Sequence, residues 1–274
     1  MRNIFVTLLL LPLLAFAGTH TVVYNVTDDR VVQGSLYCKE VSIASISKLM
    51  TIYTVLQADQ NLNEKLTVTG NKVNNTKLKK GMILTRRELI DMSLISSDNL
   101  AATTLAEHYP GGMTQFVREM NYHSKQLGMK NTGFVEPTGL SPMNYSTVGD
   151  VVQLTRAVSA FAIVQEAAQT HRVITNPETV NKGYKGKSKK KSKKEPIKKK
   201  STKSTKLINN PTSNYFGHEG VITIKTGFTN AAGFCITMLL YANNQLYNIT
   251  VLGARTKQER DVLVKKSLKA IHHA

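Results

Sequence analysis

The chain has 274 residues, of which 41% are hydrophobic, and its formal net charge is +18. This length suits one large domain or two small ones, and the apolar content indicates a soluble globular core. The charge suggests nucleic-acid binding, but the segment from Lys182 to Lys206 holds 13 lysines and one glutamate, so +12 of the +18 lies there. Because the basicity is confined to one segment, with no tryptophan and no interleaved basic and aromatic residues, no nucleic-acid partner is expected.

The first 17 residues have the three parts of a secretory signal: a cation at Arg2, a short apolar run, and the small residues Ala15 and Ala17. The apolar run is too short to cross a bilayer, which takes about 20 residues. We therefore predict a signal peptide at 1–17 that is cleaved after Ala17. The mature chain, 18–274, is expected to lack a transmembrane segment and to act in the periplasm or outside the cell.

Export would permit a disulfide between the two cysteines, Cys38 and Cys235. Both lie in strand-like stretches far apart in the sequence, and a bridge requires their Cα atoms to come within about 7 Å. The sequence leaves the pairing open, and we favour two buried free thiols.

Two β-strands are predicted at the start of the mature chain, at 20–28 and 30–38, where valine and tyrosine are enriched around a turn. A helix begins at Ser45, with apolar residues near the 3.6-residue period, and 59–84 is a polar stretch of loops and short strands. A capping box at 85–88 starts the next helix.

Further helices follow along the middle of the chain. They are expected over 100–109, over 114–127 and from Ser146 or Thr147 to about 160. Three strands joined by short turns come next, at 220–227, 233–242 and 245–254, and a last helix spans 256–272. The pattern predicts one sheet built from both ends of the chain, with helices around it and an all-helical region between them.

The segment from Lys182 to Lys206 contains almost nothing apolar, so it cannot bury enough surface to fold by itself. We interpret it as a mobile insertion loop. A block of like charges is commonly just solvated. The alternative is that this segment holds the protein to anionic polymers of the cell envelope or to acidic cell-wall peptides.

Three short motifs lie in order along the chain, each at the predicted end of an element: Ser45-x-x-Lys48, Ser97-Asp98-Asn99 and Lys225-Thr226-Gly227. Each motif is weak by itself. Ser45 can simply cap a helix with Lys48 in solvent, or the Lys48 amine, three residues on, can take the proton of the serine hydroxyl. The three motifs in this order are the signature of class A β-lactamases and penicillin-binding proteins.

The chemistry of these residue types explains the combination. Ser45 is predicted as the nucleophile and Lys48 as its base, provided that burial or a nearby cation such as Lys225 lowers the pKa of the amine. Ser97 can relay a proton to the leaving amine, and Asn99 can hold a substrate amide. For Asp98, the middle residue of the second motif, capping of a helix is the favoured interpretation.

The last motif is suited to a carboxylate. Lys225 and Thr226 can bind it by charge and hydrogen bond, and Gly227 lets the substrate backbone lie along the strand edge. The backbone N–H groups of Ser45 and Phe228 are the expected oxyanion hole. The histidines lack metal-ligand spacing, so neither a metal nor another cofactor is expected.

Over nearly the whole mature chain, the sequence resembles low-molecular-mass penicillin-binding proteins of the D-alanyl-D-alanine peptidase family. The segments that carry the resemblance are ASISKLMT at 44–51, HYPGG at 108–112, FVEPTGL at 134–140 and KTGFTNAAG at 225–233. The last three are most similar to the D-alanyl-D-alanine endopeptidase branch, penicillin-binding protein 7. The resemblance implies an α/β fold in which a five-stranded antiparallel sheet is flanked by helices, with an all-helical subregion.

The resemblance also implies an activity. Members of the family are serine endopeptidases or carboxypeptidases that hydrolyse D-Ala peptide bonds in the stem peptides of peptidoglycan through an acyl-enzyme, without a metal, and β-lactams inhibit them. Carboxypeptidases of the family often carry a further β-domain and a membrane anchor. This sequence ends just after the helix at 256–272, so membrane attachment is not expected.

Two alternatives to this activity remain. A β-lactamase would share all three motifs, but a class A enzyme needs a glutamate that holds a water, within Glu-x-x-Leu-Asn, and the neighbours of Glu166 do not match. A non-catalytic scaffold would bind polyanions through the segment from Lys182 to Lys206, and the complete set of motif residues argues against it. Endopeptidase and carboxypeptidase action both cut a D-Ala bond, so the sequence does not distinguish them.

Overall fold

The computed structural model describes most of the chain, namely residues 18–36, 39–70, 74–170, 172–175, 178–179, 206–209 and 220–273. The predicted signal peptide, Cys38 and the lysine-rich segment up to residue 205 lie outside these residues. Within the described part of the chain, no helix is both long enough and apolar enough to cross a membrane.

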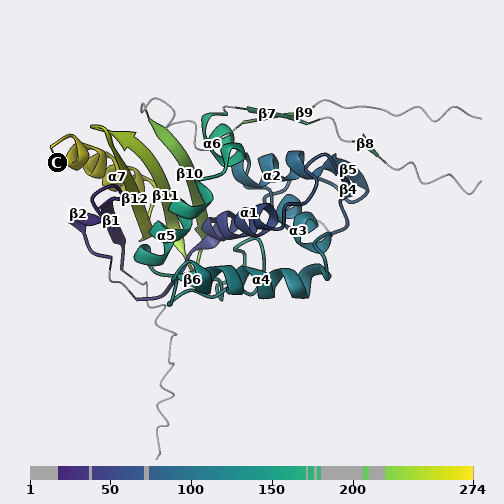
Figure 1. The fold of residues 1–274 in the computed structure, drawn as a ribbon, viewed down its shortest axis with the longest axis horizontal. Helices are drawn as coiled ribbons and strands as arrows, with labels where there is room; N and C mark the ends of the chain where they lie inside the picture. The colour runs from purple at the N-terminus through teal and green to yellow at the C-terminus, as the bar shows by residue number, and fades with distance from the viewer. Residues whose placement is uncertain are drawn as a thin grey trace, which may run out of the picture.

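A five-stranded antiparallel sheet forms one side of the molecule (Figure 1). Its strands, in spatial order, are β10 (Val221–Thr229), β11 (Gly233–Ala242), β12 (Gln245–Ala254), β1 (His20–Asn25) and β2 (Arg30–Gly34). All four neighbouring pairs are antiparallel. The expected sheet built from both ends of the chain is thereby confirmed.

The remaining strands are short and pair in three small groups. They are β3 (Val41–Ser42) with β6 (Tyr145–Ser146), then β4 (Lys65–Thr67), β5 (Met82–Thr85) and β8 (Glu178–Thr179), and finally β7 (Arg172–Thr175) with β9 (Lys206–Asn209). The lysine-rich segment therefore lies, in the sequence, between two strands that pair with each other.

The helices occupy the other side of the molecule and one face of the sheet (Figure 1). They are α1 (Ser47–Gln57), α2 (Arg86–Ile95), α3 (Asn99–Glu107), α4 (Gly112–Gln126), α5 (Val148–Val158), α6 (Ala162–Gln169) and α7 (Lys257–His272).

Both faces of the sheet are covered. Side chains alternate along β11, so Ile236 and Met238 lie on the face where Val264 of α7 is buried with them. The Thr237 side chain points to the other face, where its hydroxyl is 2.9 Å from the Thr155 hydroxyl of α5. The sheet thus lies between α7 and the helical region.

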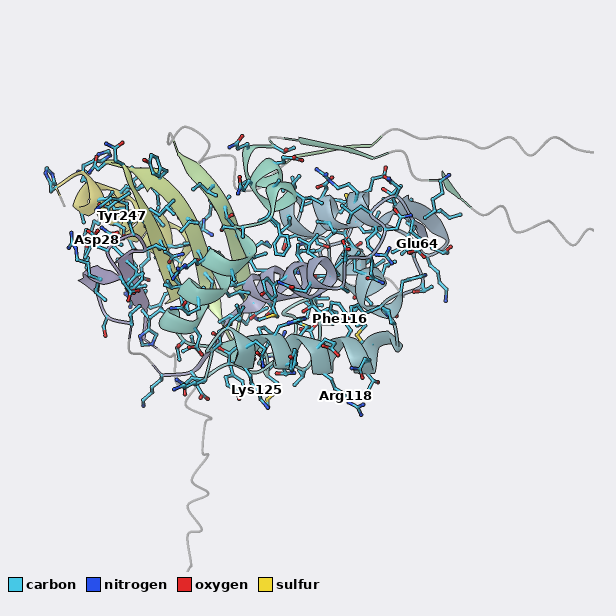
Figure 2. All side chains as sticks on the ribbon, viewed as in Figure 1. Asp28, Glu64, Phe116, Arg118, Lys125 and Tyr247 are labelled. Atoms are coloured by element: carbon cyan, nitrogen blue, oxygen red, sulfur yellow. The ribbon has the colours of Figure 1, made fainter. Side chains whose placement is uncertain are left out.

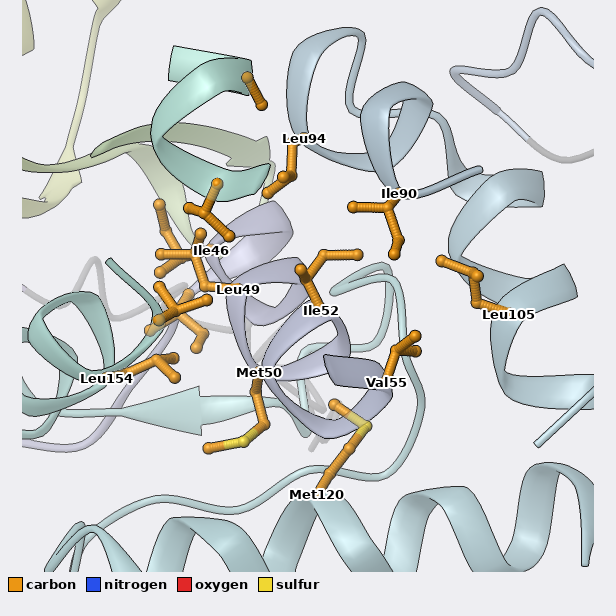
Figure 3. Close-up of a cluster of buried hydrophobic side chains, with 14 of the residues drawn as sticks. Ile46, Leu49, Met50, Ile52, Val55, Ile90, Leu94, Leu105, Met120 and Leu154 are labelled. Atoms are coloured by element: carbon orange, nitrogen blue, oxygen red, sulfur yellow. The ribbon is translucent and has the colours of Figure 1, made fainter. Parts of the chain in front are cut away.

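The helix α1 is the centre of the helical region. Its residues Leu49, Met50 and Ile52 are fully buried. Figure 3 shows side chains of the surrounding helices converging on it, among them Ile90 of α2 and Met120 of α4. Polar side chains of α1, among them Lys48 and Thr51, are fully buried as well, so neighbouring elements surround the helix. This packing holds the start of α1 rigidly, and the first motif lies there.

The helix α4 has the opposite character, with one apolar and one polar side. Phe116 is buried toward α1, whereas Arg118 and Lys125 point away from the protein (Figure 2). Such a helix stabilises the fold through one face only.

Several local predictions can be compared directly with the structure. The capping box is present, with Thr85 as N-cap and Glu88 bonded back to it. Thr147 is the N-cap of α5. The helix expected to begin at Ser45 is instead preceded by a 3₁₀ turn, and α1 starts two residues later. No helix was expected at α6, which begins without a side-chain cap.

The cysteine prediction is supported for one of the two residues. Cys235 is a free thiol on β11 and is fully buried. Burial raises its pKa to about 11, so the thiol stays protonated and unreactive at neutral pH.

Candidate active site

A cleft of about 1150 Å³ opens between β10 and the helical region. Its lining comes from the first, second and third motifs, from two loops and from α7. The residues are Ser45, Asn74, Asn75, Lys77, Ser96, Ser97, Asn99, Gly139, Leu140, Thr226, Gly227, Phe228, Thr229, Asn230, Phe234, Lys257 and Arg260. The three motifs, which are 48 or more residues apart in the sequence, therefore meet in one place.

Ser45 lies in the 3₁₀ turn (Ala44–Ile46) that leads into α1. Residues three apart on a helical segment face the same way, and the amine of Lys48 is 2.9 Å from the Ser45 hydroxyl oxygen. The alternative for this motif, a serine cap with a solvated lysine, is wrong, because Lys48 is fully buried and no Ser45 side-chain cap bond forms.

Lys48 Nζ has three hydrogen-bond partners. Besides Ser45, the amine donates to the Asn99 side-chain oxygen at 2.6 Å and to the Thr138 carbonyl at 2.7 Å. A neutral amine has two hydrogens and one lone pair. Two partners are oxygens that can only accept, and the third, Ser45, is a hydroxyl that can accept from a charged Lys48 or donate to a neutral one.

Burial also lowers the pKa of Lys48 to about 7, while the negative charges of Glu136 and Asp98 act in the opposite direction. The lowering was expected from burial or from Lys225, and burial is the cause. The pKa of Lys225 is lowered well below its usual value, by burial first and by the nearby charge of Lys48 second. A substantial fraction of Lys48 is therefore neutral near pH 7.

The second motif forms the turn between α2 and α3. Ser97 has φ +56°, a left-handed conformation that is uncommon for residues other than glycine and that clusters at functional sites. Asp98 is the N-cap of α3 and accepts from Ala101 N at 3.0 Å, which confirms capping as its role. The same carboxylate accepts from Thr76 Oγ1 and Lys77 N and so fixes the neighbouring loop.

That neighbouring loop was not expected at the site. Asn75 Nδ2 donates to the Ser97 carbonyl at 2.9 Å, and Asn99 Nδ2 donates to the Asn74 carbonyl at 2.5 Å. The Asn99 side chain thus donates one hydrogen bond to Asn74 and accepts one from Lys48. Its second N–H and its second lone pair can still bind a substrate.

The third motif lies on the edge strand β10. Lys225 is fully buried and donates to Ser97 Oγ at 3.0 Å, so it joins the sheet side of the cleft to the helical side. Gly227 lies directly against the first motif, since a Cβ there would be 2.8 Å from Ser45 N. Phe228 is 52% exposed at the cleft and stacks on Phe234 with ring centroids 4.2 Å apart.

The predicted residues therefore converge, although not all at the surface of the cleft. Ser45, Ser97, Asn99, Thr226, Gly227 and Phe228 line it, whereas the two lysines lie buried beneath. Lys257 and Arg260 of α7 also line it and were not predicted, because in the sequence they belong to an ordinary amphipathic helix. Lys257 adds positive charge at the sheet side of the cleft, whereas the Arg260 guanidinium is paired with the Asp261 carboxylate at 2.7 Å.

The cleft provides no residue for the β-lactamase alternative. The carboxylate of Glu166 accepts from Arg87 Nη2 at 2.6 Å, is 60% exposed and lies outside the cleft lining. The lining residues, among those that the structure describes, include no aspartate or glutamate. Nor does the described part of the chain bring three histidine, cysteine or acidic side chains together as a metal site.

The sequence is similar to known cell-wall enzymes. A family model described as D-alanyl-D-alanine carboxypeptidase matches residues 13–256. The D-alanyl-D-alanine endopeptidase of Escherichia coli K12 is 35% identical over 223 residues, which cover 77% of this chain and 63% of that protein. The D-alanyl-D-alanine endopeptidase of Pseudomonas aeruginosa PAO1 is 34% identical over 244 residues, which cover 86% of this chain and 68% of that protein. The chain thus spans about two thirds of the length of these relatives.

The fold is similar to solved structures over almost its full length. The Streptomyces K15 DD-transpeptidase superimposes with a TM-score of 0.80 and 21% identity, covering 95% of this chain and 98% of that one. Penicillin-binding protein D2 from Listeria monocytogenes, in its ampicillin-bound form, gives a TM-score of 0.73 with 25% identity, covering 98% and 99% of the two chains. The match confirms the predicted α/β architecture.

Proposed function

Because the chain belongs to the D-alanyl-D-alanine carboxypeptidase family, we propose that it is a serine peptidase that hydrolyses D-Ala peptide bonds in peptidoglycan stem peptides. One observation carries this proposal: the Ser45 hydroxyl lies 2.9 Å from a buried amine whose pKa is about 7, in a cleft shared by all three motifs. Endopeptidase action on cross-linked stem peptides is the preferred form, since relatives named as endopeptidases match this chain at 34–35% identity over most of its length.

In the proposed mechanism, neutral Lys48 takes the Ser45 proton as Oγ attacks the D-Ala carbonyl carbon. The oxyanion accepts hydrogen bonds from the backbone N–H groups of Ser45 and Phe228. The C–N bond then breaks, and the leaving amine receives a proton through Ser97. Water hydrolyses the serine ester and regenerates the enzyme. The missing side chain at Gly227 supports this assignment, because a Cβ would crowd the Ser45 N–H.

The substrate's carboxylate would be bound at the sheet side of the cleft. Thr226 lines the cleft, and Lys225 lies buried behind it with its amine 2.9 Å from the Thr226 carbonyl. Arrival of a carboxylate favours the charged form of Lys225, which burial alone disfavours. Lys257, which also lines the cleft, adds positive charge on the same side for a second carboxylate, as a cross-linked peptide would supply.

The direct test is digestion of purified muropeptides by the protein and by its Ser45→Ala variant. We expect the wild-type protein to convert D,D-cross-linked dimers to monomers and the variant to leave them intact. Release of D-Ala from monomeric pentapeptides, with dimers untouched, would replace endopeptidase by carboxypeptidase action. Failure to cleave either substrate would refute the proposed function.

β-Lactams are expected to acylate Ser45 and to remain bound, because the described residues of the cleft lining include no carboxylate that could activate a water against the ester. A long-lived label from a fluorescent penicillin, with slow turnover of a chromogenic cephalosporin, is the predicted result. Rapid turnover would favour the β-lactamase alternative instead.

The location of the protein is also a proposal. We infer cleavage of a signal peptide after Ala17 and function in the periplasm. Thr19 supports this position, because its hydroxyl donates to Glu259 at 2.8 Å and thereby attaches the chain to α7 just after the cleavage point. Mass spectrometry of the exported protein should find Gly18 as its first residue, and an intact N-terminus would contradict the signal peptide.

The lysine-rich segment is proposed to bind anionic cell-wall polymers through its charge of +12. Deletion of residues 182–205 should reduce co-sedimentation with purified cell walls at low salt and leave penicillin labelling unchanged. Equal sedimentation of both proteins would leave the segment as a solvated loop.

A further inference from the structure

Glu136 is at the centre of a hydrogen-bond cluster beside the active site. One carboxylate oxygen accepts from Thr138 N at 2.7 Å and from Thr138 Oγ1 at 2.5 Å. The other accepts from Gly139 N at 2.6 Å, Ser141 N at 3.3 Å and Asn144 Nδ2 at 3.2 Å. The carboxylate thus links four residues of the loop, Thr138, Gly139, Ser141 and Asn144, through five hydrogen bonds.

The loop that Glu136 organises contacts α1 at two points and the 3₁₀ turn before it at a third. The Thr138 carbonyl accepts from Lys48 Nζ at 2.7 Å, and the Pro137 carbonyl accepts from Thr51 Oγ1 at 2.6 Å. Gly139 has φ +80° and lies so close to the turn that a Cβ would be 1.8 Å from the Ala44 carbonyl oxygen. The loop thus packs against the backbone beside Ser45 and against the amine of Lys48.

The charged and polar groups around Lys48 come from three elements. Glu136 belongs to the loop, Asp98 and the uncharged Asn99 to the start of α3, and Lys225 to β10. Glu136 and Asp98 favour the charged form of Lys48, and burial favours the neutral form. Removal of the Glu136 charge therefore makes Lys48 easier to deprotonate.

We propose that Glu136 is a positioning residue for acylation, which holds the Thr138 carbonyl against Lys48 Nζ so that the amine points its lone pair at the Ser45 hydroxyl. This inference rests on the proposed function and adds a residue that none of the three motifs contains. Its carboxylate does not activate the deacylating water, because both of its oxygens already accept hydrogen bonds from the loop. Its charge also favours the charged form of Lys48 and so opposes the effect of burial.

Three variants test this role. Glu136→Gln replaces one accepting oxygen by an NH₂ group that faces donors, and it removes the charge. Glu136→Asp keeps the charge but withdraws it from its donors by one methylene. Glu166→Gln is the matched control, since it removes a carboxylate that pairs with Arg87 on the helical region, outside the cleft.

The measurements are the second-order rate of acylation by a fluorescent penicillin from pH 5 to 9, the rate at which the label is lost, and thermal unfolding of each variant. For Glu136→Gln we expect acylation to fall by about tenfold or more, as lost charge-assisted hydrogen bonds predict, and its acid limb to move to lower pH. Glu136→Asp should be slowed but keep the wild-type acid limb. Glu166→Gln should match wild type in both respects.

The opposing outcomes are distinct. Acylation of Glu136→Gln within about twofold of wild type, with an unmoved acid limb, refutes the inference alone. So does normal acylation with a longer-lived label, which would assign Glu136 to deacylation. If Glu136→Gln does not fold, Glu136→Asp decides: acylation at the wild-type rate refutes the role. A wild-type protein that takes no label refutes the proposed function and this inference with it.

Discussion

The pH dependence of acylation follows from the environment of Lys48. An exposed lysine titrates near 10.5, and burial lowers the pKa of Lys48 to about 7. The neutral fraction is then about one half at pH 7, about one tenth at pH 6 and about one hundredth at pH 5. Because only the neutral amine can take the Ser45 proton, we expect the acylation rate to fall about tenfold per pH unit below 7.

The assay is the second-order rate of labelling by a fluorescent penicillin in buffers from pH 5 to 9 at constant ionic strength. Circular dichroism at each pH is the control that the protein remains folded. A rate that is constant from pH 5 to 8 would show that Lys48 is not the base. A rate that still rises about tenfold per pH unit up to pH 9 would show that the amine has an ordinary pKa, and would refute the argument from burial.

Two further predictions concern the sheet side of the cleft and the helical region. Gly227→Ala places a Cβ 2.8 Å from the backbone N of Ser45, so penicillin acylation should fall by about tenfold or more and the temperature of thermal unfolding should fall as well; unchanged acylation would argue against a tight fit there. Burial raises the pKa of Asp91 to about 6, although Arg87 opposes this. Between pH 4 and 6 the folded state therefore keeps a proton that the unfolded chain, in which an aspartate has a pKa of 3.8, releases. The free energy of unfolding should therefore fall by about 2 kcal/mol as the pH rises from 4 to 7, and Asp91→Asn should lack this decrease in urea titrations. Parallel curves for the two proteins would contradict the assignment.

The parts of the fold that local sequence determines were predictable. The strands expected at 233–242 and 245–254 coincide with β11 and β12. Asn243 and Asn244 both have positive φ in the turn between them, a conformation that asparagine tolerates and that two-residue hairpins require. The Thr85–Glu88 capping box likewise depends on neighbours in the sequence only.

The residues that escaped prediction act through tertiary contacts. Glu136 acquires its importance because its loop packs against α1, and Arg260 because α7 reaches the cleft. Neither contact leaves a periodic or local trace in the sequence. The 3₁₀ turn at Ser45 is a similar case. Gly139 and Gly227 pack closely against its backbone, and both come from distant parts of the sequence.

The most direct test of the account is to locate the acylated residue. Intact-mass spectrometry after incubation with benzylpenicillin should show one added penicillin on the wild-type protein, and peptide mapping should place it on Ser45. The Ser45→Ala variant should gain no mass while its thermal unfolding remains that of a folded protein. An adduct that persists in Ser45→Ala, or that maps to another residue, would contradict the assignment of the nucleophile and the mechanism built on it.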